Sequence, residues 1–183
     1  MVYCAFGSQN TLQKEQFQEL LLGFELCGQP FLVALSTPDG CATIEEALLE
    51  GFEERVKGRG WVYGGWVPQT LILEHPSVGC FMTYCGYGSM WESLLNDCQI
   101  VCVPHIFDQI VNARFMVEEL KVALNVERED NGCIAKESLS KAIIFAVDKN
   151  SEVAGLVKHN HAKACKRDIW TLSFRAYRVF WIN

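Results

Sequence analysis

The sequence lacks an excess of positive charge, and it lacks long apolar runs. Its 183 residues carry 16 lysines and arginines against 22 aspartates and glutamates, for a formal net charge of -6. A chain of this sign repels polyanions and offers no electrostatic footprint for nucleic acid. No stretch approaches the roughly 18 apolar residues of a membrane-spanning helix. We therefore expect neither a nucleic-acid partner nor a membrane partner.

Paired cysteine motifs are also missing. The nine cysteines include no CxxC pair, and Cys98 and Cys102 flank an apolar run as small core residues do. This spacing predicts reduced, buried thiols rather than a disulfide framework, and therefore a reducing, cytoplasmic location. His159 and His161 form an HxH pattern on a predicted helix, where residues two apart point to different faces. They are expected to be solvated surface residues, and no metal site is predicted.

No targeting segment precedes the first apolar run. Met1 is not followed by the basic segment of a signal peptide, and residues 2–6 have the pattern of a buried strand without a preceding cap or turn. Because of this strand pattern at its start, the chain is expected to begin inside a larger fold. The composition, with 50% hydrophobic and 21% charged residues, predicts one packed domain.

The sequence does contain a regular alternation of strand-like and helix-like patterns. Strands are predicted at residues 2–6, 31–35, 61–63, 78–82, 100–103 and 124–126, and helices at 12–26, 44–56, 90–95, 108–121, 136–147 and 152–165. Elements that alternate in this way form a parallel sheet with helices on its faces. The predicted fold class is α/β, a doubly wound, Rossmann-like sheet that binds ligands at the carboxyl ends of its strands.

Three strand-to-helix turns carry residues suited to a ligand. They are Gly7-Ser8, the segment from Cys85 to Ser89, and residues 104–109. Gly86 and Gly88 in the middle turn would let backbone approach a phosphate, and Ser89 stands where the next helix is expected to start. Taken alone, this turn is also typical of a tight turn with a serine N-cap and no ligand.

A longer pattern runs from Trp66 to Gln109. It reads WVPQTLILEHPSVGCFMTYCGYGSMWESLLNDCQIVCVPHIFDQ, with the landmarks Trp66, Pro68-Gln69, His75-Pro76, Gly79, Cys85-Gly86, Ser89, Glu92-Ser93, Pro104 and Asp108-Gln109. In residue type and spacing it resembles the plant secondary-product glycosyltransferase box of family-1 UDP-glycosyltransferases. Similarity to that family extends over roughly residues 2 to 163. The first strand and the middle turn resemble members that add a sugar to a flavonoid or anthocyanidin glycoside.

The resemblance implies the C-terminal, donor-binding domain of a two-domain GT-B enzyme. Residues 1–165 would form the UDP-sugar-binding domain, and residues 166–183 a divergent tail whose pattern is compatible with a helix. In a helix, the tail would place Trp170, Phe174, Tyr177 and Trp181 on one apolar stripe. If exposed, that stripe would favour association with another surface.

Binding of the nucleoside is assigned to four residues of the box. Trp66 offers an indole that can stack on uracil for about 1–3 kcal/mol, the alternative being a core aromatic. The resemblance implies that the main chain of Val67 and the side chain of Gln69 complete uracil recognition. Glu92, one helical turn after Ser89, could accept hydrogen bonds from both ribose hydroxyls, or else be an ordinary exposed helix residue.

The diphosphate is expected at two helix N-termini. Ser8, Gly88 and Ser89 would offer hydroxyl and backbone donors there, and Gly86 belongs to the same turn as the last two. No metal or other cofactor is then required, because the UDP-sugar is itself a substrate.

The transferred sugar is assigned to the last helix of the box. Asp108 and Gln109 open that helix, where a carboxylate and an amide could bind sugar hydroxyls and fix their orientation. The resemblance implies a tendency toward glucose-type donors for a final glutamine.

One residue and one pair of residues depart from the box, Tyr84 and Tyr87-Gly88. Tyr84 stands where the family has a histidine that would donate to a phosphate, and a neutral phenol forgoes charge assistance of about 1 kcal/mol. Tyr87-Gly88 replaces a Trp-Asn pair, which removes an amide side chain from the phosphate turn. Tyr84 can still donate a hydrogen bond to a phosphate as a neutral group.

No catalytic residue is predicted within this chain. The resemblance implies a base, a histidine oriented by an aspartate, in the missing N-terminal domain, which also holds the small-molecule acceptor; His75 and His105 match structural positions of the box instead. The leading hypothesis is the donor domain of an inverting enzyme that transfers a hexose or pentose from UDP to a metabolite such as a flavonoid glycoside. The alternative is a truncated, non-catalytic nucleotide-binding module. A dinucleotide-binding oxidoreductase domain is a distant third, because no GxGxxG follows the first strand.

Overall fold

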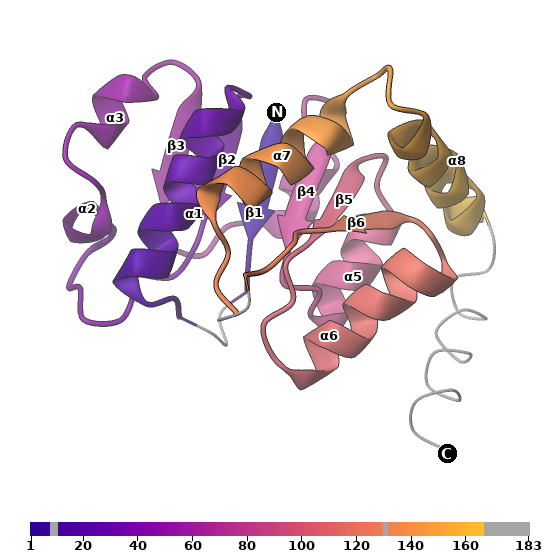
Figure 1. The fold of residues 1–183 in the computed structure, drawn as a ribbon, viewed down its shortest axis with the longest axis horizontal. Helices are drawn as coiled ribbons and strands as arrows, with labels where there is room; N and C mark the ends of the chain where they lie inside the picture. Colours follow the sequence, from indigo (N-terminus) through magenta and orange to yellow (C-terminus); the bar gives the residue numbers. More distant parts are fainter. Residues whose placement is uncertain (8–10, 130–131, 167–183) are drawn as a thin grey trace.

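The computed structural model describes residues 1–7, 11–129 and 132–166 and contains one parallel sheet (Figure 1). Its six strands are β1 Val2–Ala5, β2 Phe31–Ala34, β3 Gly60–Tyr63, β4 Cys80–Thr83, β5 Gln99–Cys102 and β6 Ala123–Asn125. They lie in the order β3-β2-β1-β4-β5-β6, with every neighbouring pair parallel. The strand order reverses between β1 and β4, which is where sheets of this class bind ligands. The predicted α/β doubly wound fold is confirmed.

Helices occupy most of the remaining described chain. They are α1 Lys14–Cys27, α2 Ile44–Ala47, α3 Phe52–Arg55, α4 Gln69–Leu73, α5 Tyr87–Leu94, α6 Phe107–Arg114, α7 Lys136–Val147 and α8 Glu152–Lys166, with a π-helical turn at Phe115–Glu119 after α6. The single helix predicted at 44–56 is wrong. Leu48 is extended and Gly51 adopts a left-handed conformation with φ of 69°, so the segment forms two short helices. Helix α4 was not predicted.

The core lies on both faces of the sheet because successive strand residues point to opposite sides. In β1, Val2 and Cys4 pack with residues of α1 and α7, whereas Tyr3 and Ala5 pack with Leu73 of α4 on the other face. Helices α1 and α7 cross in front of the sheet in Figure 1 and pack closely on each other. Gly23 is required at that crossing, since a Cβ there would lie 2.6 Å from Leu139 Cδ2.

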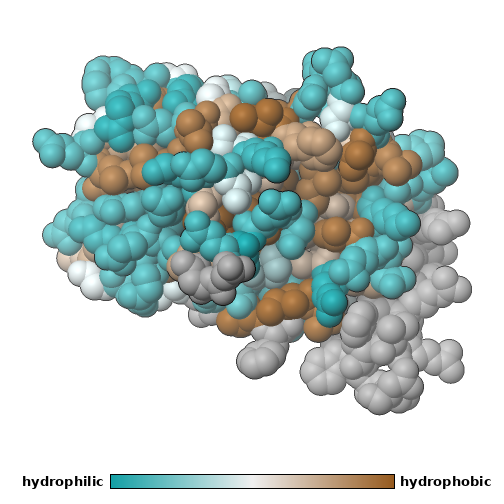
Figure 2. Space-filling view, viewed as in Figure 1, coloured by the Kyte–Doolittle hydropathy of each residue, from teal (hydrophilic) through white to brown (hydrophobic). Residues whose placement is uncertain are grey.

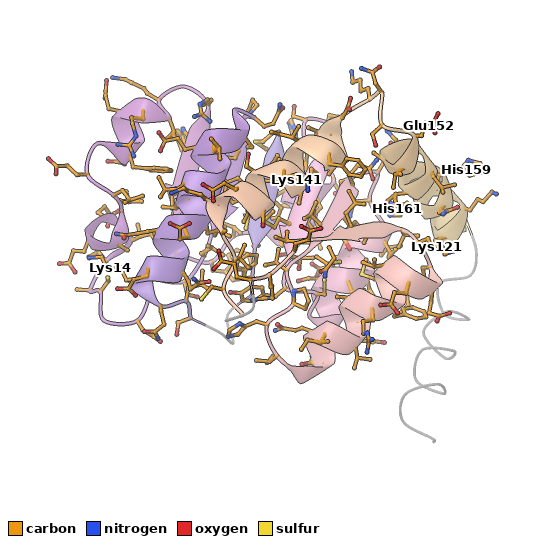
Figure 3. The ribbon with its side chains drawn as sticks, viewed as in Figure 1. Lys14, Lys121, Lys141, Glu152, His159 and His161 are labelled. Atoms are coloured by element: carbon orange, nitrogen blue, oxygen red, sulfur yellow. The ribbon has the colours of Figure 1, made fainter. Side chains whose placement is uncertain are left out.

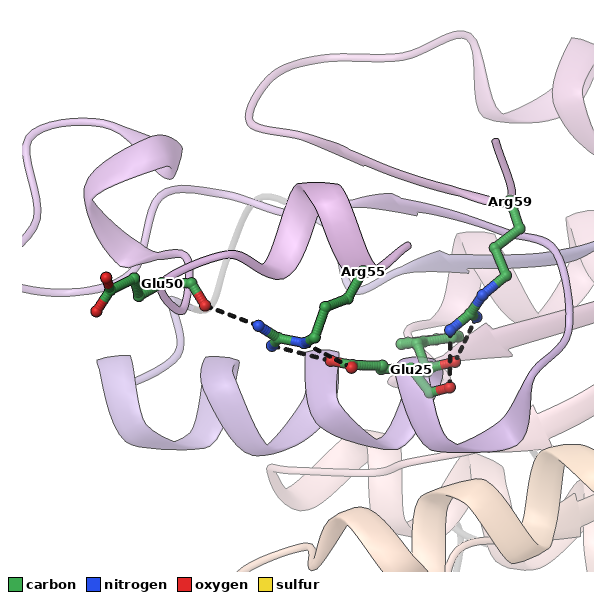
Figure 4. Close-up of polar contacts among 5 residues, drawn as sticks. Glu25, Glu50, Arg55 and Arg59 are labelled. Carbon is green, nitrogen blue, oxygen red and sulfur yellow. Dashed lines mark hydrogen bonds and ion pairs between the residues drawn. The ribbon is translucent and has the colours of Figure 1, made fainter. Parts of the chain in front are cut away.

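The surface of the α1 and α7 face is mainly hydrophilic over α1 to α3, and apolar side chains gather over α7 and α8 (Figure 2). Helix α1 is tied to the neighbouring segments by two arginines (Figure 4). Arg55 pairs with the Glu25 carboxylate at 2.7 Å and donates to the Glu50 carbonyl. Arg59 donates to the main-chain carbonyls of Phe24 and Glu25, near the C-terminal end of α1. Arg59 therefore joins two segments through main-chain carbonyls, and no ion pair among the described residues includes it.

Helix α8 is anchored beside α5 by His161 (Figure 3). The two histidines of the HxH pattern do face different ways: His159 is exposed, as predicted, but His161 is only 3% exposed, so its predicted surface position is wrong. His161 Nε2 lies 3.3 Å from the Leu94 carbonyl oxygen, which can only accept, so this nitrogen carries the proton. Burial lowers the pKa of His161, although the bond to Leu94 opposes that shift.

Three further predictions concern the cysteines, membrane-spanning segments and the C-terminal tail. Among the described residues, eight cysteines are thiols outside any disulfide, and six of them are buried, as expected of core thiols. No helix within the described ranges is long and apolar enough to cross a bilayer. The predicted aromatic stripe of residues 167–183 lies outside the described residues.

Candidate functional site

A pocket of about 430 Å³ lies at the carboxyl edge of the sheet, where the strand order reverses. Its lining residues are Phe6, Gly7, Gln69, Thr83, Tyr84, Gly86, Tyr87, Gly88, Ser89, Glu92, Asp108 and Gln109. Phe6 and Gly7 directly follow β1, and Tyr84 directly follows β4. The chain turns sharply at both places, with left-handed φ values of 73° at Gly7 and 63° at Cys85. The fold therefore builds the pocket from the ends of the two strands at the switch point.

Eight of the eleven predicted site residues line this pocket: Gln69, Tyr84, Gly86, Gly88, Ser89, Glu92, Asp108 and Gln109. Trp66 and Val67 are not in the lining. They precede α4, whose first residue Gln69 is in the lining, and three residues of chain span at most about 11 Å. Trp66 is 85% exposed, so its indole is not a core aromatic. Ser8 lies outside the described residues.

Helix α5 points its N-terminus at the pocket. It begins at Tyr87, with Gly86 at the N-cap, so the expectation that Ser89 stands at the helix start is wrong by two residues. The first backbone N–H groups of a helix have no partner within the helix and carry partial positive charge. Gly88 and Ser89 belong to this first turn, which can therefore bind an anion with main-chain donors.

Gln69 joins α4 to α5 through two hydrogen bonds. Its Nε2 donates to Ser89 Oγ at 3.1 Å and to the Glu92 carboxylate. Both hydrogens of the amide are then used, which leaves Gln69 Oε1 and Glu92 Oε1 as acceptors on two residues that line the pocket. An amide oxygen and a carboxylate oxygen can each accept from a hydroxyl of a ligand. The sequence did not predict this contact, since Gln69 was assigned to uracil.

Gln109 folds back over the start of α6. Its Oε1 accepts the backbone N–H groups of His105 at 2.9 Å and Ile106 at 3.2 Å, which is half of a capping box. Gln109 is 5% exposed and lines the pocket, so its amide NH₂ is the group left to donate toward a ligand. Asp108 beside it is exposed and can only accept when ionised. The start of α6 thus presents one donor and one acceptor.

Tyr84 is buried in a stack of rings. It is 3% exposed, and its ring centroid lies 3.7 Å from that of Phe6 and 5.7 Å from that of His105, with interplanar angles of 12° and 18°. Burial raises the pKa of Tyr84, which keeps the phenol neutral. Whether its hydroxyl reaches a diphosphate stays a prediction.

Several lining and supporting residues were missed. Phe6, Thr83 and Tyr87 line the pocket, and the position of the first two directly at strand ends was a usable signal. Thr83 Oγ1 accepts the Cys85 N–H at 3.2 Å, and Asn112 Nδ2 donates to the Cys85 carbonyl at 2.9 Å. These two bonds hold the left-handed backbone of the turn before α5. Within the described part of the chain, no group of three or more His, Cys, Asp or Glu side chains is placed to hold a metal.

Comparison with known sequences gives a consistent set of relatives. The family model for UDP-glucoronosyl and UDP-glucosyl transferase matches residues 24–157. UDP-glycosyltransferase 79B9 of Arabidopsis thaliana is 63% identical over 163 residues, which are 89% of this chain and 36% of that protein. Anthocyanidin 3-O-glucoside 2'''-O-xylosyltransferase of the same plant is 56% identical over 164 residues, covering 89% of this chain and 35% of that protein. The chain thus spans little more than a third of these relatives.

Solved structures agree on the fold. UGT2 of Phytolacca americana, in complex with UDP-2-fluoro-glucose and pterostilbene, aligns with a TM-score of 0.81 and 29% identity. The alignment covers 90% of this chain and 36% of that one. Os79 from O. sativa, in complex with UDP, aligns with a TM-score of 0.80 at 23% identity, over 90% of this chain and 36% of that one.

Proposed function

We propose that this chain, which belongs to the UDP-glucuronosyl and UDP-glucosyl transferase family, binds the UDP part of a UDP-sugar in the pocket at the switch point. The resemblance predicted from residues 66–109 is confirmed, because the family match covers residues 24–157. The six-stranded sheet corresponds to one domain of the two-domain GT-B glycosyltransferases. Binding by this particular chain, and the role of each residue in it, are the proposal.

The observation that carries the proposal is the contact of Gln69 with Ser89 and Glu92 at the N-terminus of α5. The contact leaves Gln69 Oε1 and Glu92 Oε1 as acceptors in the pocket, beside a helix N-terminus, and so supports binding of ribose hydroxyls and a diphosphate there. Uracil would then lie toward the start of α4, stacked on Trp66 and bonded by the main chain of Val67. In this arrangement Gln69 acts on the ribose rather than on the base.

The remaining groups divide between diphosphate and sugar. Gly86, Gly88 and Ser89 supply main-chain donors to the diphosphate, with Ser8 expected to add a hydroxyl. Asp108 would accept from one sugar hydroxyl and the Gln109 amide would donate to another, because the oxygen of Gln109 is already engaged by the loop before α6. The sugar would therefore be oriented by the start of α6.

Sugar transfer needs more than this site. The acceptor oxygen forms a bond to the anomeric carbon, the bond from that carbon to the diphosphate breaks with inversion, and a base takes the acceptor proton. The described residues that line the pocket include the carboxylates Glu92 and Asp108 and no histidine. We assign the base and the acceptor site, for a metabolite such as a flavonoid glycoside, to an N-terminal domain. The xylosyltransferase relative, named for action on an anthocyanidin glucoside, supports that acceptor class.

A non-catalytic nucleotide-binding module is the second candidate. Tyr84 favours it, because a neutral ring locked between Phe6 and His105 replaces the expected histidine. Assays with UDP-glucose and flavonoid glycosides separate the two candidates when an N-terminal domain of a relative is supplied. Transfer by the pair and none by the chain alone supports the donor domain, whereas UDP binding without transfer by the pair supports the module.

The ribose assignment is tested by comparing UDP with 2'-deoxy-UDP by calorimetry. The unmodified chain should prefer UDP by about 10- to 100-fold, the weight of a hydrogen bond to a charged group. Glu92→Ala should remove most of that preference, while Glu118→Ala, an exposed glutamate in the π-helical turn, should keep it. A preference for UDP that survives Glu92→Ala would remove Glu92 from the ribose site.

A further inference from the structure

A row of four side chains lies at the carboxyl edge of four neighbouring strands, and two of the four, Phe6 and Tyr84, line the pocket. Phe6 follows β1, Tyr84 follows β4, His105 comes three residues after β5, and Arg128 comes three residues after β6. Phe6, Tyr84 and His105 stack in sequence. The Arg128 guanidinium is close enough to interact electrostatically with the Tyr84 phenol. The row therefore connects strand ends that are far apart in the sequence.

Arg128 closes this row with main-chain contacts. Its Nη2 donates to the Pro104 carbonyl and its Nη1 donates to the Gly132 carbonyl. None of the ion pairs among the described residues includes Arg128. Two of the five N–H donors of the guanidinium thus bind two loops, the one after β5 and the one before α7.

The loop that Arg128 holds is the one that presents the sugar-binding residues. Pro104 is followed by His105 and Ile106, whose N–H groups fix the Gln109 side chain. A shift of Pro104 would therefore move the anchor of Gln109 and the first turn of α6, which also carries Asp108. The contacts among Gln69, Ser89 and Glu92 are made between α4 and α5 and include no atom of this loop.

We infer that Arg128 is a positioning residue for the sugar part of the donor. It acts through the loop 104–109 and does not itself line the pocket. The inference rests on the proposed function, because it assumes that the start of α6 faces a sugar. It implies that loss of Arg128 weakens UDP-glucose binding much more than UDP binding.

The test compares Arg128→Met with Arg59→Met. Arg59 is a matched control, because it also bridges two main-chain carbonyls, those of Phe24 and Glu25, but does so at the other edge of the sheet (Figure 4). Calorimetric titrations with UDP and with UDP-glucose are made for both variants and the unmodified chain. Arg128→Met should lower UDP-glucose affinity by about tenfold relative to UDP, the weight of one hydrogen bond to a charged group. Arg59→Met should leave the ratio of the two affinities unchanged.

If Arg128→Met leaves the ratio of the UDP and UDP-glucose affinities unchanged, whether or not both affinities fall, the inference is overturned. Arg128 would then only stabilise the fold. Should Arg128→Met not fold, Arg128→Lys, which cannot bridge both carbonyls in the same fork, takes its place with the same expected direction. Hydrogen exchange at the His105 and Ile106 amides provides a readout without nucleotide. Faster exchange at these amides in the Arg128 variant, and not in the Arg59 variant, would support the role of Arg128 in holding the loop 104–109, even if the chain did not bind UDP. Unchanged exchange in the Arg128 variant would contradict that role.

Discussion

Trp66 allows binding to be separated from folding more cleanly than any other predicted site residue. The side chain is 85% exposed in the free protein, so Trp66→Ala removes almost no buried contact. We therefore expect the thermal midpoint of the variant to stay close to that of the unmodified chain, since exposed substitutions change stability by about 0.5 kcal/mol or less. Stacking of a base on an aromatic ring is worth about 1–3 kcal/mol. The dissociation constant for UDP should therefore rise by about 5- to 160-fold.

The matched control is Trp61→Ala. Trp61 is 75% exposed on β3 and has no role in the proposed site. Its removal should leave UDP affinity unchanged within about twofold. Calorimetry gives the affinities, and thermal melts without ligand give the stabilities. Two results would refute the reasoning: equal UDP affinity in Trp66→Ala and the unmodified chain, or a loss of affinity matched by Trp61→Ala.

Two further predictions concern buried rings. Tyr84→His should tighten UDP binding by about 1 kcal/mol if position 84 faces the diphosphate, and it should lower the stability of the fold through loss of the stack on Phe6. Tyr84→Phe keeps the stack. It should leave UDP affinity and stability unchanged if the phenol makes no phosphate contact. Unchanged UDP affinity in Tyr84→His would place the side chain away from the diphosphate. For His161, burial lowers the folded-state pKa, so the unfolded chain takes up the proton first and stability falls as the pH drops below about 6.5. Thermal melts across that pH range should show a smaller loss of stability in His161→Gln than in the unmodified chain, and the same loss in His159→Gln as in the unmodified chain. Equal dependence of stability on pH in all three proteins would contradict the assignment.

The sheet could be predicted because strand and helix patterns in this chain differ clearly in period. The failures have local causes. Helix α4 has five residues, too few to show a helical period. It lies within the glycosyltransferase box, where Gln69 was assigned to ligand binding rather than to a secondary-structure element. The segment 44–56 has apolar residues at helical spacing, but the left-handed Gly51 divides it. The burial of His161 depends on the Leu94 carbonyl, which is 67 residues away in sequence.

The site could be predicted where a motif names residue types, and not where contacts depend on folding. The box places eight residues that line one pocket. It does not show that Gln69 bonds Glu92, because the two residues meet only when α4 packs beside α5. Arg128 lies outside the box and binds main-chain carbonyls, which leave no trace in the sequence. Physical coupling between loops therefore requires the structure.

The central claim is that this chain binds the UDP part of a nucleotide sugar. Its most direct test is a calorimetric titration of the folded chain with UDP and, separately, with ADP. We predict measurable binding of UDP and weaker binding of ADP, because the stacking and main-chain contacts proposed at Trp66 and Val67 fit a pyrimidine. Absence of UDP binding would contradict the claim, and equal affinity for the two nucleotides would contradict the uracil assignment.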